Sequence, residues 1–160
     1  MLRVHIVHVG TVKEKYLTDA IGEYEKRLSA YCTLDNISIK EERLPDKPSE
    51  AEIAAALMRE GERILGAIPP RAFSIALCVE GKQLTSEKFS EKLSALANDG
   101  FSDIYLIIGG SDGLSVAVKR ACHMRLSISE MTFPHQLMRV ILLEQLYRAF
   151  NIASGGKYHK

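Results

Sequence analysis

The sequence predicts an α/β fold in which a mainly parallel sheet carries helices on both of its faces. Two stretches, 73–79 and 104–108, have almost no polar residues, and strands of that kind occur in sheets that are covered on both sides. They alternate with helical stretches, which is typical of a parallel sheet whose strands are joined by helices. A length of 160 residues with 46% hydrophobic residues suffices for one buried core, so we expect a single domain over 1–160.

The amino-terminal part predicts a strand and then an amphipathic helix. Residues 2–9 alternate apolar with polar and then become apolar, which suits a strand entering a core. His5 and His8 are three residues apart on this strand, so they point to opposite faces and cannot share a metal ion. The next stretch has three- and four-residue apolar spacing, which predicts a core-facing helix. Its core positions are Tyr16, Leu17, Ala20, Ile21, Tyr24, Leu28 and Tyr31.

An edge strand and a capped helix follow. Residues 34–40 alternate Ile37 and Ile39 with polar residues, as expected of a strand with one solvent-exposed face. Ser49 and Glu52 have the spacing of a capping box, so a helix should begin here and run to about Ala67, before two prolines.

The second half repeats this alternation. Strand 73–79 should end at Glu80-Gly81-Lys82, and a helix should begin at Thr85 or Ser86 and end near residues 98–100. A short helix over 118–122 then leads to strand 124–128. In the loop that follows, Thr132 can supply a capping hydroxyl, and Pro134 suits the first position of a final, largely apolar helix.

Composition excludes several classes of protein. No apolar run reaches the roughly 20 residues of a membrane span, and no signal-peptide pattern is present, so we expect a cytoplasmic protein. The three cysteines are far apart, which predicts reduced thiols and no cysteine metal site. We expect no metal centre. A net charge of +1 gives no overall basic field for nucleic acid, although Arg139, Arg148 and the carboxyl-terminal tail are candidates for a local basic cluster.

Three predicted strand ends, 77–81, 108–113 and 128–133, are candidates for a ligand pocket. Ligands of open α/β sheets usually lie at the carboxyl ends of strands. The Gly-Gly-Ser-Asp-Gly segment over 109–113 is neither a Walker loop nor a Gly-x-Gly-x-x-Gly fingerprint, so the sequence gives no specific support for a nucleotide phosphate.

The final helix leaves two interpretations open. It is apolar on nearly all sides, and such a helix needs more than one packing neighbour, for which a subunit interface is the natural candidate. Glu144 and Arg148 are four residues apart and either form an ordinary intrahelical pair or line a polar cleft across a dimer. His135 either bonds its own loop or takes part in catalysis.

Several motifs together are similar to one family. They are Gly109–Gly113, Met131–Gln136 (Met-Thr-Phe-Pro-His-Gln), Arg139–Val140, Glu144–Ala149 (Glu-Gln-Leu-Tyr-Arg-Ala) and Tyr158–Lys160. With Gly10 and Lys13–Tyr16, they resemble the ribosomal RNA large subunit methyltransferase H family of SPOUT-class enzymes over nearly the whole chain. Many members have Asn-His-Pro-Tyr-His near the end, where this chain has Ser-Gly-Gly-Lys-Tyr-His over 154–159.

The resemblance implies a SPOUT-type α/β knot, with a carboxyl-terminal trefoil knot over about 72–160. Pattern reading alone predicts an unknotted sheet, since knotted chains are rare. The resemblance also implies that the knot binds S-adenosylmethionine in a bent form and that a homodimer completes the site. The implied cofactor positions are Leu77, Gly109, Ile128, Ser129, Glu130, Met131, Thr132 and Phe133.

The implied reaction is methylation of N3 of a pseudouridine, the 1915-type position of 23S rRNA, in the assembled 70S ribosome. Glu144, His135 and His159 are the candidate groups to accept the N3 proton, and Arg148 is the candidate to stabilise charge on the uracil ring. The candidates for RNA contact are Arg139, Arg148, Tyr158 and Lys160.

Two other classes of function remain as alternatives. A non-catalytic ribosome-binding or assembly module on the same fold would keep the RNA contacts and need no cofactor. A flavodoxin-like nucleotide or flavin enzyme is suggested only by the alternation of strands and helices, and the absence of a phosphate fingerprint counts against it.

Overall fold

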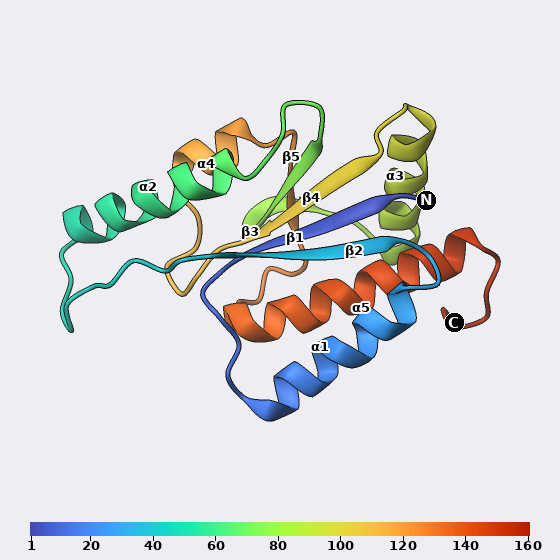
Figure 1. Ribbon diagram of the computed structural model, residues 1–160, viewed down its shortest axis with the longest axis horizontal. Helices are drawn as coiled ribbons and strands as arrows, with labels where there is room; N and C mark the ends of the chain where they lie inside the picture. Colours follow the sequence, from blue (N-terminus) through green and yellow to red (C-terminus); the bar gives the residue numbers. More distant parts are fainter.

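The sheet is wholly parallel, and its strands lie in the order β2-β1-β4-β3-β5. The structure is a computed structural model that describes residues 1–160 (Figure 1). The strands are β1 (Arg3–Val9), β2 (Thr33–Ile39), β3 (Phe73–Gln83), β4 (Asp103–Ile108) and β5 (Met124–Ser127). The helices are α1 (Lys15–Leu28), α2 (Glu50–Gly66), α3 (Ser86–Asn98), α4 (Val116–Ala121) and α5 (His135–Ala153). The predicted α/β class with a parallel sheet is therefore confirmed.

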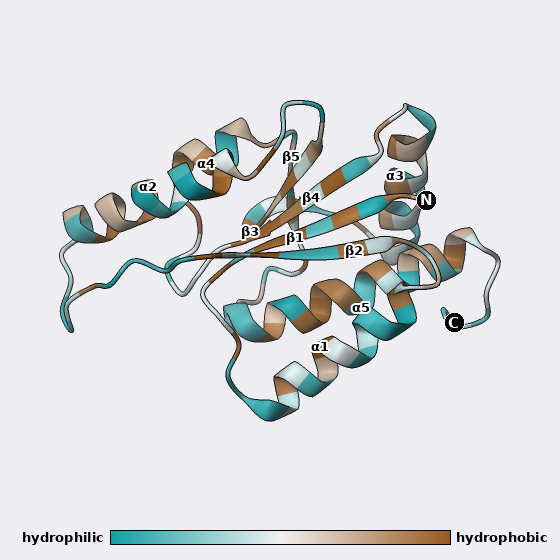
Figure 2. Ribbon diagram, in the orientation of Figure 1, coloured by the Kyte–Doolittle hydropathy of each residue, from teal (hydrophilic) through white to brown (hydrophobic).

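Helices cover both faces of the sheet, as its apolar strands require (Figure 2). The larger cluster of buried side chains joins one face to α1, α3 and α5, and the smaller one joins the opposite face to α2 and α4. Strand β4 shows the reason, because Leu106 packs into the first cluster and Ile107 into the second. Strand β2 lies at the sheet edge, as its alternating pattern predicts.

Strand β3 continues through Glu80-Gly81-Lys82 to Gln83, so the predicted end of this strand at residue 79 is wrong. Leu126 of β5 pairs with both Leu77 and Lys82, because the register of β3 shifts between these two residues. Gly81 permits this arrangement, since a Cβ at this position would lie 2.7 Å from the backbone carbon of Leu126. The backbones of β3 and β5 therefore approach each other unusually closely at residue 81.

The capping signals predict the starts of two helices correctly, whereas the predicted core face of α1 begins one residue too early. Ser49 and Glu52 form the complete capping box of α2, and Thr85 caps α3 by accepting a hydrogen bond from the Lys88 N–H. Tyr16 was expected in the core, but it is 71% exposed. The core face of α1 begins one residue later, at Leu17.

The amino-terminal ends of β1 and β4 are joined by a polar network. Two nitrogens of Arg3 donate to the carboxylate of Asp103, at 2.6 and 2.8 Å. His5 Nε2 lies 2.9 Å from the same carboxylate, and its ring stacks on Tyr105 with 4.2 Å between centroids. His8 points elsewhere, with Nδ1 2.8 Å from the carbonyl oxygen of Gly10. The two histidines therefore belong to separate surroundings.

No helix combines the length and the apolar character that a membrane span requires. No group of three or more His, Cys, Asp or Glu side chains is arranged to hold a metal ion. The trefoil knot and the boundary of its cofactor-binding part near residue 72 stay predictions.

Candidate functional site

A cavity of about 740 Å³ opens at the carboxyl end of the sheet. Three segments form most of it: the middle of β3, the loop after β4, and the loop between β5 and α5. The cavity is lined by Leu77, Cys78, Val79, Glu80, Ile108, Gly109, Gly110, Ser111, Asp112, Gly113, Leu114, Lys119, Leu126, Ile128, Ser129, Met131, Thr132, Phe133, Pro134, His135 and Met138. The cavity thus lies where ligands bind in open parallel sheets.

Glycines shape the loop after β4. The Gly113 N–H donates to the Gly110 carbonyl at 3.0 Å, which closes a tight turn. Gly113 has a φ of 80°, which a residue with a side chain rarely adopts. A Cβ on Gly109 would lie 2.3 Å from the Gly113 carbonyl oxygen, so only glycine allows the loop to fold this closely on itself. The turn leaves bare backbone facing the cavity.

Serines, and not Thr132, fix the loop between β5 and α5. Ser129 Oγ accepts the Met131 N–H at 3.0 Å, and Ser127 Oγ donates to the Ser129 carbonyl at 3.0 Å. No side chain caps α5, so the capping role expected for Thr132 is wrong. Pro134 is the N-cap, one position before its predicted place, and it has no N–H that would need a partner.

The structure brings together all but one of the implied cofactor residues. Only Glu130 does not line the cavity; Leu77, Gly109, Ile128, Ser129, Met131, Thr132 and Phe133 all do. The volume falls within the range of about 300–1,000 Å³ of small-molecule sites, and apolar walls alternate with backbone groups as such sites require. The cavity thus has the size and lining of a small-molecule site.

A second polar cluster lies towards the other end of α5. Arg148 Nη2 donates to Glu144 Oε1 at 2.6 Å, and the Tyr158 hydroxyl donates to the same oxygen at 3.1 Å. Arg148 Nη1 donates to His159 Nδ1 at 3.1 Å, and His159 Nε2 donates to Glu87 Oε1 at 2.6 Å. These partners assign the ring proton of His159 to Nε2. The hydrogen bond to Glu144 raises the pKa of Arg148. The intrahelical pair of Glu144 and Arg148 thus belongs to a larger network.

The carboxyl-terminal tail folds back onto α5 to complete this cluster. The Gly156 N–H donates to the Asn151 carbonyl and the Gly155 N–H to the Ile152 carbonyl, which is a Schellman helix end. Gly155 has the required positive φ of 74°. The buried Asn151 side chain accepts the Tyr158 N–H at 3.0 Å, and a Cβ on Gly156 would lie 2.3 Å from this side chain. Gly155 and Gly156 lie in the segment where this chain departs from the family pattern, and their backbone conformation allows Tyr158 to reach Glu144.

The three candidate proton acceptors do not meet within one chain. His135 lines the cavity at the first residue of α5, whereas Glu144 is nine residues further along the helix, about 14 Å away. His159 lies with Glu144 through their shared contact with Arg148. The cavity and the polar cluster are therefore separate places on one subunit.

The candidates for RNA contact also lie apart. Tyr158 and Arg148 belong to the polar cluster, where the Arg148 guanidinium lies 4.7 Å from the Tyr158 ring centroid. Lys160 is exposed at the chain end. Arg139 is only 12% exposed, its Nε is buried without a hydrogen-bond partner, and its nearest carboxylate, Glu25, is 4.0 Å away. Burial lowers the pKa of Arg139.

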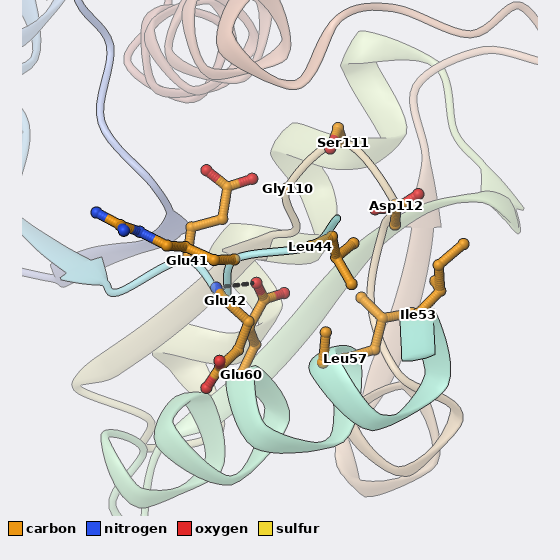
Figure 3. A pocket seen from close by; sticks show the side chains of 11 residues that line it. Glu41, Glu42, Leu44, Ile53, Leu57, Glu60, Gly110, Ser111 and Asp112 are labelled. Atoms are coloured by element: carbon orange, nitrogen blue, oxygen red, sulfur yellow. Dashed lines mark hydrogen bonds between the residues drawn. The ribbon is translucent and has the colours of Figure 1, made fainter. Parts of the chain in front are cut away.

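A smaller cavity of about 430 Å³ lies on the other side of the loop after β4 (Figure 3). Four carboxylates and one guanidinium line it, so acidic groups predominate: Glu41, Glu42, Glu60 and Asp112, with Arg43. The Glu42 N–H donates to Glu60 at 2.9 Å, and burial raises the pKa of Glu60. Because carboxylates repel phosphate, this cavity is a poor candidate for RNA contact.

Sequence reasoning missed one charged residue of the larger cavity, Lys119. Lys119 on α4 and Glu80 on β3 line its rim and form an ion pair at 2.5 Å. Glu80 belongs to the strand end 77–81 that was predicted to border a pocket. Helix α4 is only six residues long, so its periodicity says little about the direction of Lys119.

Curated relatives of similar length match nearly the whole chain. Ribosomal RNA large subunit methyltransferase H of Leuconostoc mesenteroides is 48% identical over 159 residues, which cover 99% of this chain and 100% of the relative. The protein of the same name from Streptococcus suis is 46% identical with the same coverage.

Solved structures show the same fold at low sequence identity. A probable methyltransferase from Bordetella pertussis superposes with a TM-score of 0.56 at 16% identity, covering 93% of this chain and 96% of that one. A probable methylase family protein from Haemophilus influenzae gives 0.53 at 13% identity, covering 99% of this chain and 70% of that one. A family model described as "Predicted SPOUT methyltransferase" matches residues 2–159. The chain therefore belongs to the SPOUT methyltransferase family.

Proposed function

We propose that this chain transfers a methyl group from S-adenosylmethionine to N3 of a pseudouridine in 23S rRNA. The observation that carries the proposal is the cavity at the strand ends, lined by all but one of the cofactor positions that the family resemblance implies. The names of the relatives support ribosomal RNA of the large subunit as the substrate. The family membership supports a methyl transfer.

The cavity residues would hold the donor and align it. S-adenosylmethionine supplies an activated methyl group on its sulfonium, so the protein has to orient it towards the acceptor nitrogen and exclude water. Backbone groups at Leu77, Gly109 and 128–133 can bond to the adenine and ribose, and the side chains of Ile128 and Phe133 provide apolar walls. The tight loop over 109–113 keeps these groups in place before binding.

The N3 proton of the pseudouridine has to leave for methylation to proceed. Glu144, His135 and His159 are the proposed acceptors, and Arg148 would stabilise the negative charge that develops on the ring. His135 is the acceptor candidate beside the cavity of its own chain. Glu144 and His159 would act from the polar cluster.

A two-fold dimer would unite the two halves of the site. The cavity is at the start of α5 and the polar cluster is towards its end, so an antiparallel pairing of two α5 helices would set each cavity beside the partner's cluster. The outward side of α5 supports such a pairing, because Leu137 is 36% exposed and Ile141 is only partly buried. The buried, unpartnered Nε of Arg139 on the same helix would gain an acceptor there or on RNA.

Recognition of RNA would depend on the assembled 70S ribosome. With a net charge of +1, the chain has no broad basic surface that would bind free RNA strongly. Tyr158 would stack on a base that is turned out of its helix, and Arg139 and Lys160 would contact phosphates. This substrate requires the cytoplasm as the site of action.

The test is methylation of ribosomes that lack the modification. The protein is incubated with labelled S-adenosylmethionine and 70S ribosomes, separated subunits or free 23S rRNA, and the labelled nucleotide is then identified. We expect N3-methylpseudouridine in large-subunit RNA of 70S ribosomes and little product on free RNA. If no ribosomal RNA is labelled and S-adenosylmethionine does not stabilise the protein against heat, a cofactor-free ribosome-binding module is the better explanation.

A further inference from the structure

The larger cavity is lined by one lysine, Lys119, and by no arginine. The other charged or titratable side chains that line it are Cys78, Glu80, Asp112 and His135. Lys119 Nζ lies 2.5 Å from Glu80 Oε1, so the ammonium and the carboxylate form an ion pair beside the cavity. They come from different elements, since Glu80 is on β3 and Lys119 is on α4.

Backbone contacts fix the position of Lys119. Its N–H donates to the Ser115 carbonyl at 3.2 Å, and its own carbonyl accepts a hydrogen bond from Arg125 Nη1 at 2.9 Å. The Lys119 side chain is 26% exposed, whereas that of Glu80 is 59% exposed. Lys119 is therefore the more buried partner of the pair and Glu80 the more exposed one.

Such a pair is complementary to a zwitterion whose carboxylate and ammonium share one carbon atom. The ligand's carboxylate can take the place of Glu80 on Lys119, and its ammonium can bind Glu80. Partly exposed ion pairs contribute little to stability, so the exchange of partners loses little. Two hydrogen bonds between charged groups then replace one, within a cavity that shields them partly from water.

We propose that Lys119 and Glu80 bind the amino-acid end of the methyl donor, with the α-carboxylate on Lys119 and the α-ammonium on Glu80. This inference rests on the proposed function, because it assumes that the cavity holds S-adenosylmethionine. It adds a specificity: the cavity prefers ligands with an intact amino acid over nucleosides that have lost it.

Three ligands separate the parts of the proposal. S-adenosylhomocysteine carries both charged groups, decarboxylated S-adenosylmethionine lacks the carboxylate, and 5′-methylthioadenosine lacks both. Their dissociation constants are measured by calorimetry for the unaltered protein and for Lys119→Gln and Glu80→Gln. Arg120→Gln is the matched control, because it removes a positive charge from the exposed neighbouring position of α4 and does not line the cavity.

Lys119→Gln should raise the dissociation constant of S-adenosylhomocysteine about tenfold and change those of the other two ligands by no more than about twofold. Glu80→Gln should weaken the binding of the two ligands that carry the ammonium and leave the binding of 5′-methylthioadenosine unchanged. Arg120→Gln should change none of them. Equal losses for all three ligands would mean a structural effect and would overturn the inference, as would no loss for any.

The unaltered protein separates this inference from the proposed function. If it binds S-adenosylhomocysteine no more tightly than 5′-methylthioadenosine, the donor site stands and the role of Lys119 and Glu80 is wrong. If it binds none of the three ligands, the proposed function fails and the inference fails with it.

Discussion

Arg148 binds the carboxylate of Glu144 through two nitrogens, with an Nη2–Oε1 distance of 2.6 Å and an Nε–Oε1 distance of 3.1 Å. The side chains are 24% and 18% exposed, so the pair is shielded more than an ordinary helix-surface pair. Tyr158 donates to the same oxygen of Glu144. Arg148 and Tyr158 thus hold the carboxylate in one orientation, and its second oxygen, Oε2, accepts only a long hydrogen bond of 3.4 Å from Arg148 Nε.

Glu144→Gln should abolish most methyl transfer while preserving donor binding. Glutamine keeps the shape of the side chain and loses the charge that orients Arg148 and, by our proposal, takes part in removing the N3 proton. We expect turnover on 70S ribosomes to fall by about 10²- to 10⁴-fold. The dissociation constant of S-adenosylhomocysteine should stay unchanged, because Glu144 does not line the cavity.

Glu87→Gln is the matched control for this variant. Glu87 is the other carboxylate of the cluster and bonds to His159, but its side chain is 56% exposed. Its loss should reduce turnover far less. Full activity of Glu144→Gln on ribosomes would rule out Glu144 as the acceptor and leave His135 and His159.

Charge on the outer side of α5 should separate the proposed dimer. Leu137→Glu and Ile141→Glu place a carboxylate where the second subunit would pack, and burying an unpaired charge is strongly unfavourable. Sedimentation velocity should show a dimer for the unaltered protein and monomers for both variants. Val116→Glu, at a 60% exposed position on α4, should remain a dimer. A monomeric unaltered protein at all concentrations would refute the shared site.

The apolar pattern predicts the sheet well because both clusters take their side chains from the same strands. Leu106 and Ile107 face opposite sides, so a strand without polar residues can only lie in the middle of such a sheet. The extension of β3 to Gln83 was not predictable in this way. Glu80-Gly81-Lys82 has the composition of a turn, and only its pairing with Leu126, more than 40 residues later, makes it a strand.

Gly81→Ala should destabilise the fold by about 1–3 kcal/mol, because the added Cβ would overlap the backbone of Arg125 and Leu126. Chemical denaturation gives the free energy of unfolding. Gly22→Ala is the control, since nothing lies within 4 Å of its Cβ position on α1. Alanine there should stabilise the protein by about 0.5–1 kcal/mol. Equal effects at the two positions would contradict the close approach of β3 and β5.

Asp103→Asn should lower stability at neutral pH and have less effect in acid. Hydrogen bonds from Arg3, and then from His5, hold the pKa of Asp103 well below its usual range. A depressed pKa contributes stability above the unfolded value of about 3.9, and this contribution disappears as the pH falls through the folded value. The melting temperatures of the two proteins should therefore converge below about pH 4. Asp46→Asn, at an exposed loop position, should show no such convergence.

The candidate site was predictable in its parts and not in its assembly. The strand-end loops carry recognisable glycines and a distinctive Met131–Gln136 segment, so the cavity walls could be named in advance. The separation of His135 from Glu144 follows from nine residues of helix, and sequence reasoning grouped them because the resemblance supplied roles without distances. The contact of Glu80 with Lys119 depends on the tertiary arrangement of β3 and α4, which no local pattern encodes.

The pairing of β1 with β4 has a consequence for biosynthesis. Arg3 and Asp103 are 100 residues apart in sequence, so β1 has only β2 as a neighbour until more than 100 residues have left the ribosome. During that interval the nascent chain exposes one unpaired edge of β1, and most of the residues from Val4 to Val9 are buried in the folded protein. Non-local pairing of this kind slows folding, and chaperones that cover apolar segments should therefore engage this chain early in translation.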